Sequence, residues 1–252
     1  MNLYNYIKNS FINKKRINLK ILPSQGFFYE EDFYLYVKKA SKKDIELYQN
    51  DFVPGDLGII LSKIKNIVFS NIISNYDFDN IKSIDIIFIF FEIIKFTKNK
   101  PFKILYYDKN ANKKEIEFSS KYFNYYDFSK LKDKWNKVDR CFDINGYKYT
   151  LPSISIENCL TEFLYQRSFE KDSQKWNKYS YDFLYFLGKK KFIDFEDIEN
   201  LIQIFNYDLN EIESQKVSSI IKIFNKLQRY TLLDKGYEVD LSTRINLQYV
   251  WK

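Results

Sequence analysis

Histidine is absent from this chain of 252 residues. Histidine is the commonest general base in enzymes and the commonest metal ligand, so its absence excludes every Ser–His or Cys–His catalytic pair. Glycine (6 residues) and proline (4 residues) are scarce, which excludes collagen-like chains and Gly- or Pro-rich linkers. Apolar residues make up 45% of the chain and aromatic residues 19%, which is enough to build a buried core.

Cysteine is also rare, with Cys141 and Cys159 as the two examples. They cannot form a CxxC pair, and without histidine they cannot complete a four-ligand zinc site. The carboxylates of residues 30–32 could attract a hard cation, but adjacent carboxylates repel and nothing nearby completes six oxygen ligands. We therefore expect no metal, no cofactor and two buried free thiols, although the spacing permits a disulfide.

Long apolar runs are missing too. The longest run, Ile84 to Phe91, is interrupted by Asp85 and is too short to cross a bilayer. The first eight residues contain no apolar segment followed by small residues, as a secretory signal would. The sequence therefore predicts an intracellular soluble protein with no membrane segment.

The charge balance is mildly basic, with 40 Lys+Arg against 33 Asp+Glu and a net charge of +7. Basic residues alternate with acidic ones along most of the chain, which favours a mixed solvated surface over a nucleic-acid surface. The densest positive stretch is Lys14-Lys15-Arg16 with Lys20. We interpret residues 1–20 as a basic N-terminal arm, in the first place a solvated lead-in segment; if the chain binds another subunit, the arm would become ordered only on assembly.

Hydrophobic periodicity predicts an α+β protein of two loosely similar halves, each a few helices followed by a β-hairpin. The first half, residues 21–140, contains a strand over 33–37 and a capping box in which Ser41 and Asp44 begin a helix. An amphipathic helix follows over 57–68. The next helix, over 81–96, is apolar almost all round and is expected to form the centre of the core. The strands 102–107 and 114–118 are then predicted to form a hairpin.

The second half, residues 141–252, begins with a hairpin around Asn145-Gly146. Alternation predicts that residues 236–241 pair with 244–250 in a terminal hairpin. Between the two hairpins the sequence predicts helices near 156–169, 178–187, 194–206 and 211–229. Leu-Pro-Ser occurs at residues 22–24 and again at 151–153, each time before a helical stretch. This repetition suggests a duplication, although a succession of helix and hairpin is common in α+β proteins.

No pattern in the sequence supports catalysis directly, because it has no phosphate-binding loop and no nucleophile–base pair. The 22 tyrosines and 24 phenylalanines, interleaved with lysine, could stack single-stranded nucleic acid. Most of them fall at core periodicities, so nucleic acid and small-molecule ligands are not expected. The remaining interpretation is a protein that acts through protein–protein contacts.

Three aromatic residues are candidate partner contacts: Trp135, Tyr249 and Trp251. Tryptophan is enriched at binding hot spots, and Trp251 stands one residue from the end of the sequence. The alternative for Trp251 is the protein's own core, and a tryptophan such as Trp135 is more often a core residue than a contact.

One phrase resembles a known family: Leu22-Pro23-Ser24-Gln25-Gly26-Phe27-Phe28-Tyr29. With the strand and the capped helix that follow, it is similar to the start of the T4-type baseplate proteins of contractile phage tails. Members of that family begin with an LPS-x-G-x-x-Y phrase and a β-strand, and the later order of elements over residues 20–252 is similar as well. Many relatives carry Cys-x-x-Cys pairs in a hairpin; this chain has none, so no metal is carried over.

The resemblance implies a structural subunit or assembly factor of the baseplate hub, with no catalytic residues. Its partners would be other phage baseplate and tail proteins. It would be found in the host cytoplasm during assembly and in the virion if retained. Two alternatives stay open: a carboxylate-dependent, lysozyme-like glycosidase of a tail, and a module that binds single-stranded nucleic acid.

Overall fold

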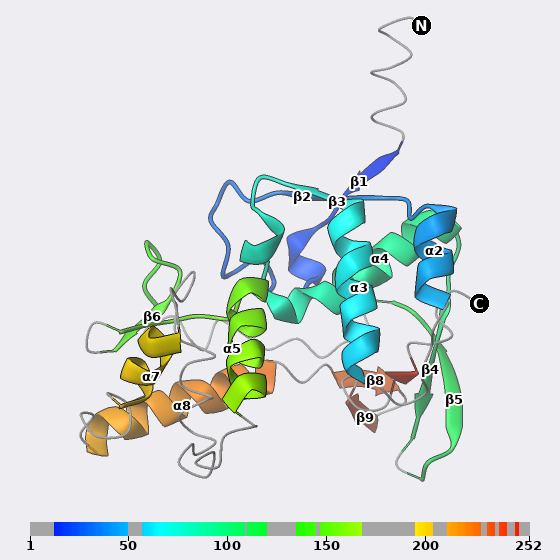
Figure 1. Cartoon of the computed structure of the whole chain (residues 1–252). Coiled ribbons are helices and arrows are strands. Elements are labelled where there is room, and N and C mark those ends of the chain that lie inside the picture. The colour runs from blue at the N-terminus through cyan, green and yellow to red at the C-terminus, as the bar shows by residue number, and fades with distance from the viewer. Residues whose placement is uncertain are drawn as a thin grey trace, which may run out of the picture.

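The structure is a computed structural model, and it describes residues 13–49, 57–108, 110–119, 135–144, 147–167, 195–203, 211–227, 231–234, 237–240 and 245–246. Helices and small antiparallel sheets with hairpins alternate along these residues, which confirms the predicted α+β class (Figure 1). The predicted helix near 178–187 lies outside the described residues.

The described helices are α2 (Lys42–Gln49), α3 (Leu57–Asn71), α4 (Ile86–Lys98), α5 (Ile154–Arg167), α7 (Phe195–Gln203) and α8 (Glu211–Leu227). Three short 3₁₀ turns accompany them: η1 (Leu19–Ile21), η2 (Phe78–Asn80) and η3 (Ser83–Asp85). The strands are β1 (Lys14–Arg16), β2 (Leu35–Lys38), β3 (Ile72–Ser74), β4 (Lys103–Tyr107), β5 (Lys113–Glu117), β6 (Phe142–Ile144), β7 (Tyr147–Tyr149), β8 (Thr231–Asp234), β9 (Tyr237–Asp240) and β10 (Ile245–Asn246).

Helix α4 forms the centre of the main core, as its apolar composition predicted. Its residues from Phe88 to Ile94 are all buried, and they pack against the inner face of β2 and against α3. The helix begins at Ile86, five residues later than predicted, because residues 78–80 and 83–85 form 3₁₀ turns instead. A helix without a solvent-facing stripe needs neighbours on every side, and α2, α3 and the sheet supply them.

The predicted capping box is confirmed at the start of α2. The Asp44 amide donates to Ser41 Oγ at 3.1 Å, and the Ser41 amide donates to Asp44 Oδ2 at 2.8 Å. Partial burial raises the pKa of Asp44, but hydrogen bonds from Ser41 and Asn71 outweigh this effect and lower the pKa below its ordinary value. The Asn71 contact ties the end of α3 to the start of α2.

The basic stretch near the N-terminus is a strand, which corrects the prediction of an unordered arm. Strand β1 pairs antiparallel with β2, with Lys15 opposite Val37, and β3 pairs on the other side of β2. Ile17 is buried in the core, and Lys15 Nζ lies 2.8 Å from the buried Glu92 carboxylate on α4. The prediction is therefore wrong for residues 13–20, and residues 1–12 lie outside the described residues.

Two of the three predicted hairpins are confirmed, and the third pairs differently. β4 pairs with β5, and β6 pairs with β7, with Ile144 opposite Tyr147. At the C-terminal end, β9 pairs with β8, and β10 pairs with β4 of the first half. The predicted pairing of 236–241 with 244–250 is therefore wrong: alternation marks a strand but does not choose its partner.

The ion pair between Lys15 and Glu92 yields a stability prediction. Lys15→Ala removes the cation nearest to a buried carboxylate and leaves Lys95 Nζ 4.0 Å away. We expect the free energy of unfolding to fall by about 2 kcal/mol, less than for a fully buried pair because Lys15 is partly exposed. Denaturant titration measures the change.

Lys42→Ala is the matched control, because Lys42 pairs with Glu46 on the surface of α2 at 3.6 Å. A surface pair contributes little, so the control should stay within about 0.5 kcal/mol of the unmodified protein. Equal losses in the two variants would contradict an anchoring role for Lys15.

Candidate functional site

The carboxylate of Asp85 is the most deeply buried charge in the described residues, and three donors surround it. Asp85 Oδ1 accepts the Ser24 amide at 2.9 Å, and Oδ2 accepts Ser24 Oγ at 2.6 Å and Tyr29 Oη at 2.7 Å. Tyr29 Oη in turn accepts the Lys82 amide at 3.0 Å. Burial raises the pKa of Asp85 to about 6, and the hydrogen bonds from Ser24 and Tyr29 limit the rise.

The phrase at residues 22–29 therefore has a structural role. Its tight turn places Gln25 at φ 52° and Gly26 at φ 73°, in the left-handed region. A Cβ atom at Gly26 would lie 2.9 Å from the Cβ of Leu19, so the position has no room for a side chain. The turn brings both Ser24 and Tyr29 within hydrogen-bond distance of Asp85.

The two phenylalanines of the same phrase begin an aromatic cluster that joins the two halves. Trp135 lies 4.4 Å from Phe27 and 4.9 Å from Phe28 between ring centroids. Phe142 of β6 packs on Trp135 at 5.1 Å and on Phe224 of α8 at 5.6 Å. This cluster forms a second core beside the one around α4.

Trp135 is thus a core residue, which corrects its prediction as a partner contact. Its side chain is only 9% exposed, and aromatic rings surround it. A residue whose surface is already covered cannot anchor a second protein without unfolding the cluster. Tyr249 and Trp251 lie outside the described residues.

The second Leu-Pro-Ser phrase packs against the same segment as the first. The Ser83 amide donates to the Pro152 carbonyl and the Ile154 amide donates to the Ile81 carbonyl, both at 3.0 Å. Ser153 then begins α5, where its carbonyl accepts the Glu157 amide at 3.0 Å. The two phrases therefore converge on residues 81–85 but use their serines differently, and the suggested duplication stays a prediction.

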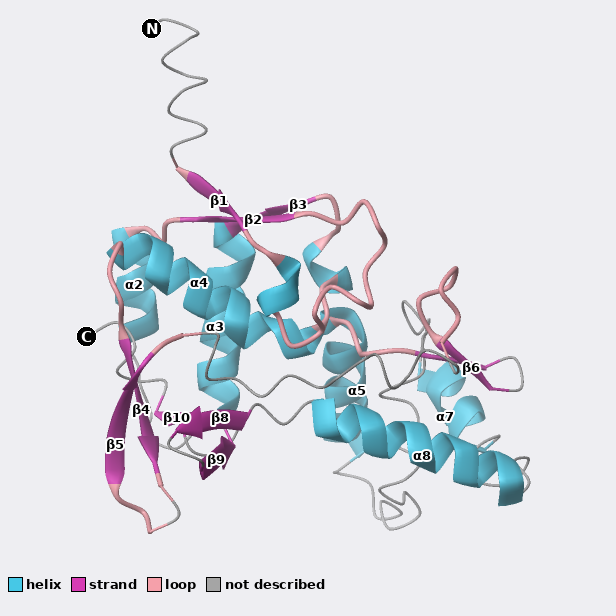
Figure 2. Cartoon of the chain, turned by 180° about the vertical axis from the view of Figure 1, so that it is seen from behind, coloured by secondary structure: helices cyan, strands magenta, loops and turns pink. Residues whose placement is uncertain are grey.

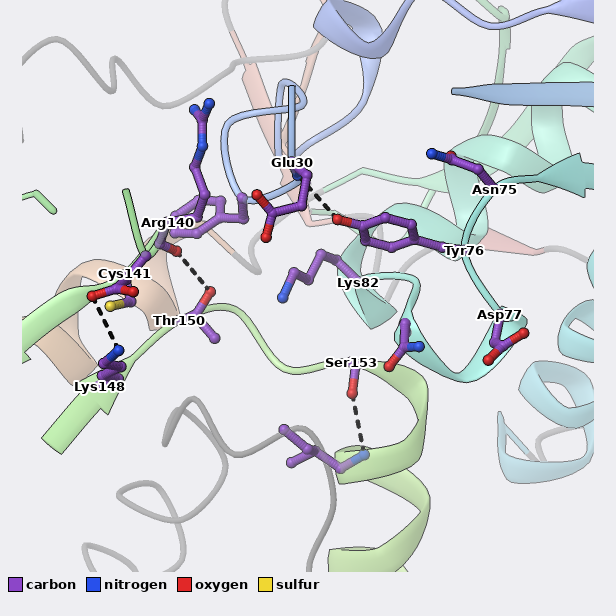
Figure 3. A pocket seen from close by; sticks show the side chains of 14 residues that line it. Glu30, Asn75, Tyr76, Asp77, Lys82, Arg140, Cys141, Lys148, Thr150 and Ser153 are labelled. Carbon is purple, nitrogen blue, oxygen red and sulfur yellow. Dashed lines mark hydrogen bonds and ion pairs between the residues drawn. The ribbon is translucent and has the colours of Figure 1, made fainter. Parts of the chain in front are cut away.

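A polar cleft of about 360 Å³ lies where the two halves meet (Figure 3). Glu30 and Lys82 extend into it from the first half, and Thr150 lies on the facing wall. Several of the charges around it are paired: Lys148 with Asp139 at 3.0 Å, and Arg140 with Glu31 at 2.9 Å. The cleft therefore has charges of both signs on its walls, rather than the single sign that a simple ion would require.

Several large apolar side chains stand exposed on the described surface. Leu47 on α2, Phe69 on α3 and Tyr165 on α5 are exposed by 59%, 64% and 66%, and Val138 in the turn after Trp135 by 85%. Phe69 contacts Phe78 at 5.3 Å between ring centroids. Sequence periodicity does not single out these residues: Phe69 directly follows the apolar positions of the helix predicted over 57–68, and Val138 stands among charged residues.

The structure also bears on the predicted thiols, metal sites and membrane segments. Cys141 is buried and Cys159 only half-buried, and both are free thiols. Within the described ranges no cluster of three or more cysteine or acidic residues could hold a metal ion. None of the helices in the described part of the chain is long and apolar enough to cross a membrane.

Comparison with known proteins finds no match for this chain among protein-family models, curated proteins or solved structures.

The raised pKa of Asp85 predicts a pH effect on stability. In the folded state the Asp85 carboxyl keeps its proton up to about pH 6. In the unfolded chain the pKa of this carboxyl has its ordinary value of 3.8. The stabilisation from protonated Asp85 is therefore complete below about pH 4, and as the pH rises through 6 about 3 kcal/mol of it is lost.

Asp85→Asn should remove this dependence. Asparagine has only one acceptor oxygen, so it cannot accept from both the Ser24 amide and Tyr29 Oη as Asp85 does, and the variant should be the less stable protein at pH 4. Its deficit should shrink by up to about 3 kcal/mol between pH 4 and pH 7. Unfolding free energies measured by denaturant titration at each pH check this. The exposed Asp79→Asn serves as control, and parallel curves for wild type and Asp85→Asn would disprove the assignment.

Proposed function

We propose that this protein is a structural or assembly protein of a contractile phage tail, in the hub region of the baseplate, and that it acts by binding other tail proteins. The proposal rests on the resemblance of residues 22–29 to the baseplate phrase. It places the protein in the host cytoplasm during assembly, and in the virion if it is retained.

The use of buried polar groups supports a structural rather than a catalytic role. The described residues bury five polar or charged side chains: Ser24, Asn71, Asp85, Glu92 and Ser153. Each has a hydrogen-bond partner within the fold. A catalytic group must keep a free side toward its substrate, and these side chains are directed at their own chain.

The exposed apolar side chains supply the observation that favours binding. Phe69 and Tyr165 lie on different helices, and each exposes about two thirds of its side chain. Large aromatic residues contribute most to binding energy where a partner covers them. We therefore assign Phe69 and Tyr165 as contact residues toward other subunits.

Co-purification tests the proposal. The chain, carrying an affinity tag, is expressed together with the tail genes of its source genome, and the bound proteins are identified by mass spectrometry. We expect baseplate, tube or sheath components. Phe69→Ser should reduce their recovery at least about fivefold with little change in melting temperature, because the side chain is already exposed.

Lys222→Ser on α8, also an exposed site, is the control and should leave recovery unchanged. A tagged chain recovered without any tail component would contradict the proposal. Loss of recovery in Lys222→Ser as well would point to general instability rather than to a contact at Phe69.

The glycosidase alternative can be tested at the polar cleft, because the carboxylates of Glu30, Asp77 and Asp139 line it. Asp85 has the raised pKa of a general acid, but its side chain is fully buried away from any substrate. We expect no turnover of peptidoglycan by the purified chain. Turnover that Glu30→Gln abolishes would establish the glycosidase instead.

A further inference from the structure

The outer face of the sheet β1–β2–β3 presents aromatic and basic side chains together. Leu35 and Val37 of β2 point into the core, so Tyr34, Tyr36 and Lys38 lie on the opposite face by alternation. The register places Arg16 beside Tyr36, and Ile73 on its other side. In both views no described helix or strand covers this face, since α2, α3 and α4 all lie on the other side (Figures 1 and 2).

The charged residues of the three strands themselves have one sign, although Glu30 and Glu31 line a hollow together with Arg16 and Tyr34. The three strands contain no aspartate or glutamate, whereas Lys14, Arg16 and Lys38 are all cations. Arg16 is exposed and has no ion pair within the described residues. The alternation of opposite charges along the sequence therefore breaks down here, because pairing of β1 with β2 gathers cations from two separate segments.

The aromatic rings are arranged for stacking. Tyr34 and Tyr36 project from the same face two residues apart, and their rings meet edge to face at 5.7 Å between centroids. Tyr34 is 37% exposed, and Lys14 Nζ lies 5.3 Å from the centre of the Tyr36 ring. Tyr36 is half-buried with Lys14 over its ring, so Tyr34 is the more accessible ring for a base, and the cations of the same face can bind the phosphate.

We propose that this sheet face binds single-stranded nucleic acid, with bases stacked on Tyr34 and Tyr36 and phosphates on Lys14, Arg16 and Lys38. Sheets that bind single strands use aromatic residues on adjacent positions of one face in this way. A duplex keeps its base faces inside the helix and cannot stack on these rings. An acidic protein surface could pair with the cations, but it would supply no bases to stack on the two tyrosine rings.

The sheet face does not include Phe69 or Tyr165, so nucleic-acid binding and the proposed baseplate contacts can fail separately. Fluorescence anisotropy of the full chain with a labelled oligodeoxythymidylate of about 15 nucleotides measures binding. At about 50 mM salt we expect a Kd on the order of 10 μM, and a plot of log affinity against log salt with a slope of about −2 for three phosphate contacts.

Variants of single residues separate stacking from charge. Tyr34→Ala should weaken binding about tenfold while Tyr34→Phe, which keeps the ring, should retain it within about twofold. Arg16→Ser should reduce the steepness of the salt dependence by about 0.7. Lys222→Ser removes an exposed cation elsewhere and should leave binding unchanged, with melting temperatures measured for every variant.

Competition decides between the possible polyanions. Unlabelled single strands should displace the probe, whereas a duplex of equal length and polyglutamate of equal charge should compete at least about tenfold less well. Equal competition by polyglutamate would assign the face to an acidic protein partner and overturn the proposal. Absence of binding at 50 mM salt, or equal weakening by the control variant, would overturn it as well.

Discussion

The carboxylate of Asp85 sits inside the core at the start of α4, where water cannot solvate its charge. A buried carboxylate is tolerated only when donors surround it, and the first Leu-Pro-Ser phrase and Tyr29 supply three. The same turn carries Phe27 and Phe28 into the aromatic cluster with Trp135. The second Leu-Pro-Ser phrase packs on the backbone beside Asp85. Both Leu-Pro-Ser phrases thus attach to the short segment that leads into α4, the first through the Asp85 carboxylate and the second through the backbone.

This arrangement separates the interior of the protein from its contact surfaces. The buried side chains of Ser24, Asn71, Asp85 and Glu92 form hydrogen bonds within the fold, so the protein uses them for its own stability. Two kinds of exposed surface remain for partners. Isolated apolar side chains such as Phe69 can be covered by another protein. The basic and aromatic sheet face instead has a charge and a geometry suited to a flexible polyanion. Different partners can therefore use different sides of one molecule.

Local elements follow closely from local sequence, because their determinants lie within a few residues. The reciprocal hydrogen bonds of Ser41 and Asp44 define the start of α2, and β6 pairs with β7 where the Asn-Gly sequence signal predicted a hairpin. Candidate contact residues were harder to predict. Trp135 looked like a partner anchor, yet Phe27 and Phe142 cover it. Its neighbours come from segments before and after it in the chain, and no pattern around residue 135 indicates them.

The sequence alone determined the α+β class, the apolar helix at the centre of the core and two of the hairpins, since periodicity and turn residues act over short range. Tertiary structure decided which strands pair: β1 with β2, and β10 with β4. A strand exposes the same backbone donors and acceptors to any neighbour, so its partner is chosen by which faces must be buried together. Lys15 illustrates this: in sequence it belongs to a basic run, and only the tertiary structure pairs it with the buried Glu92 carboxylate of α4.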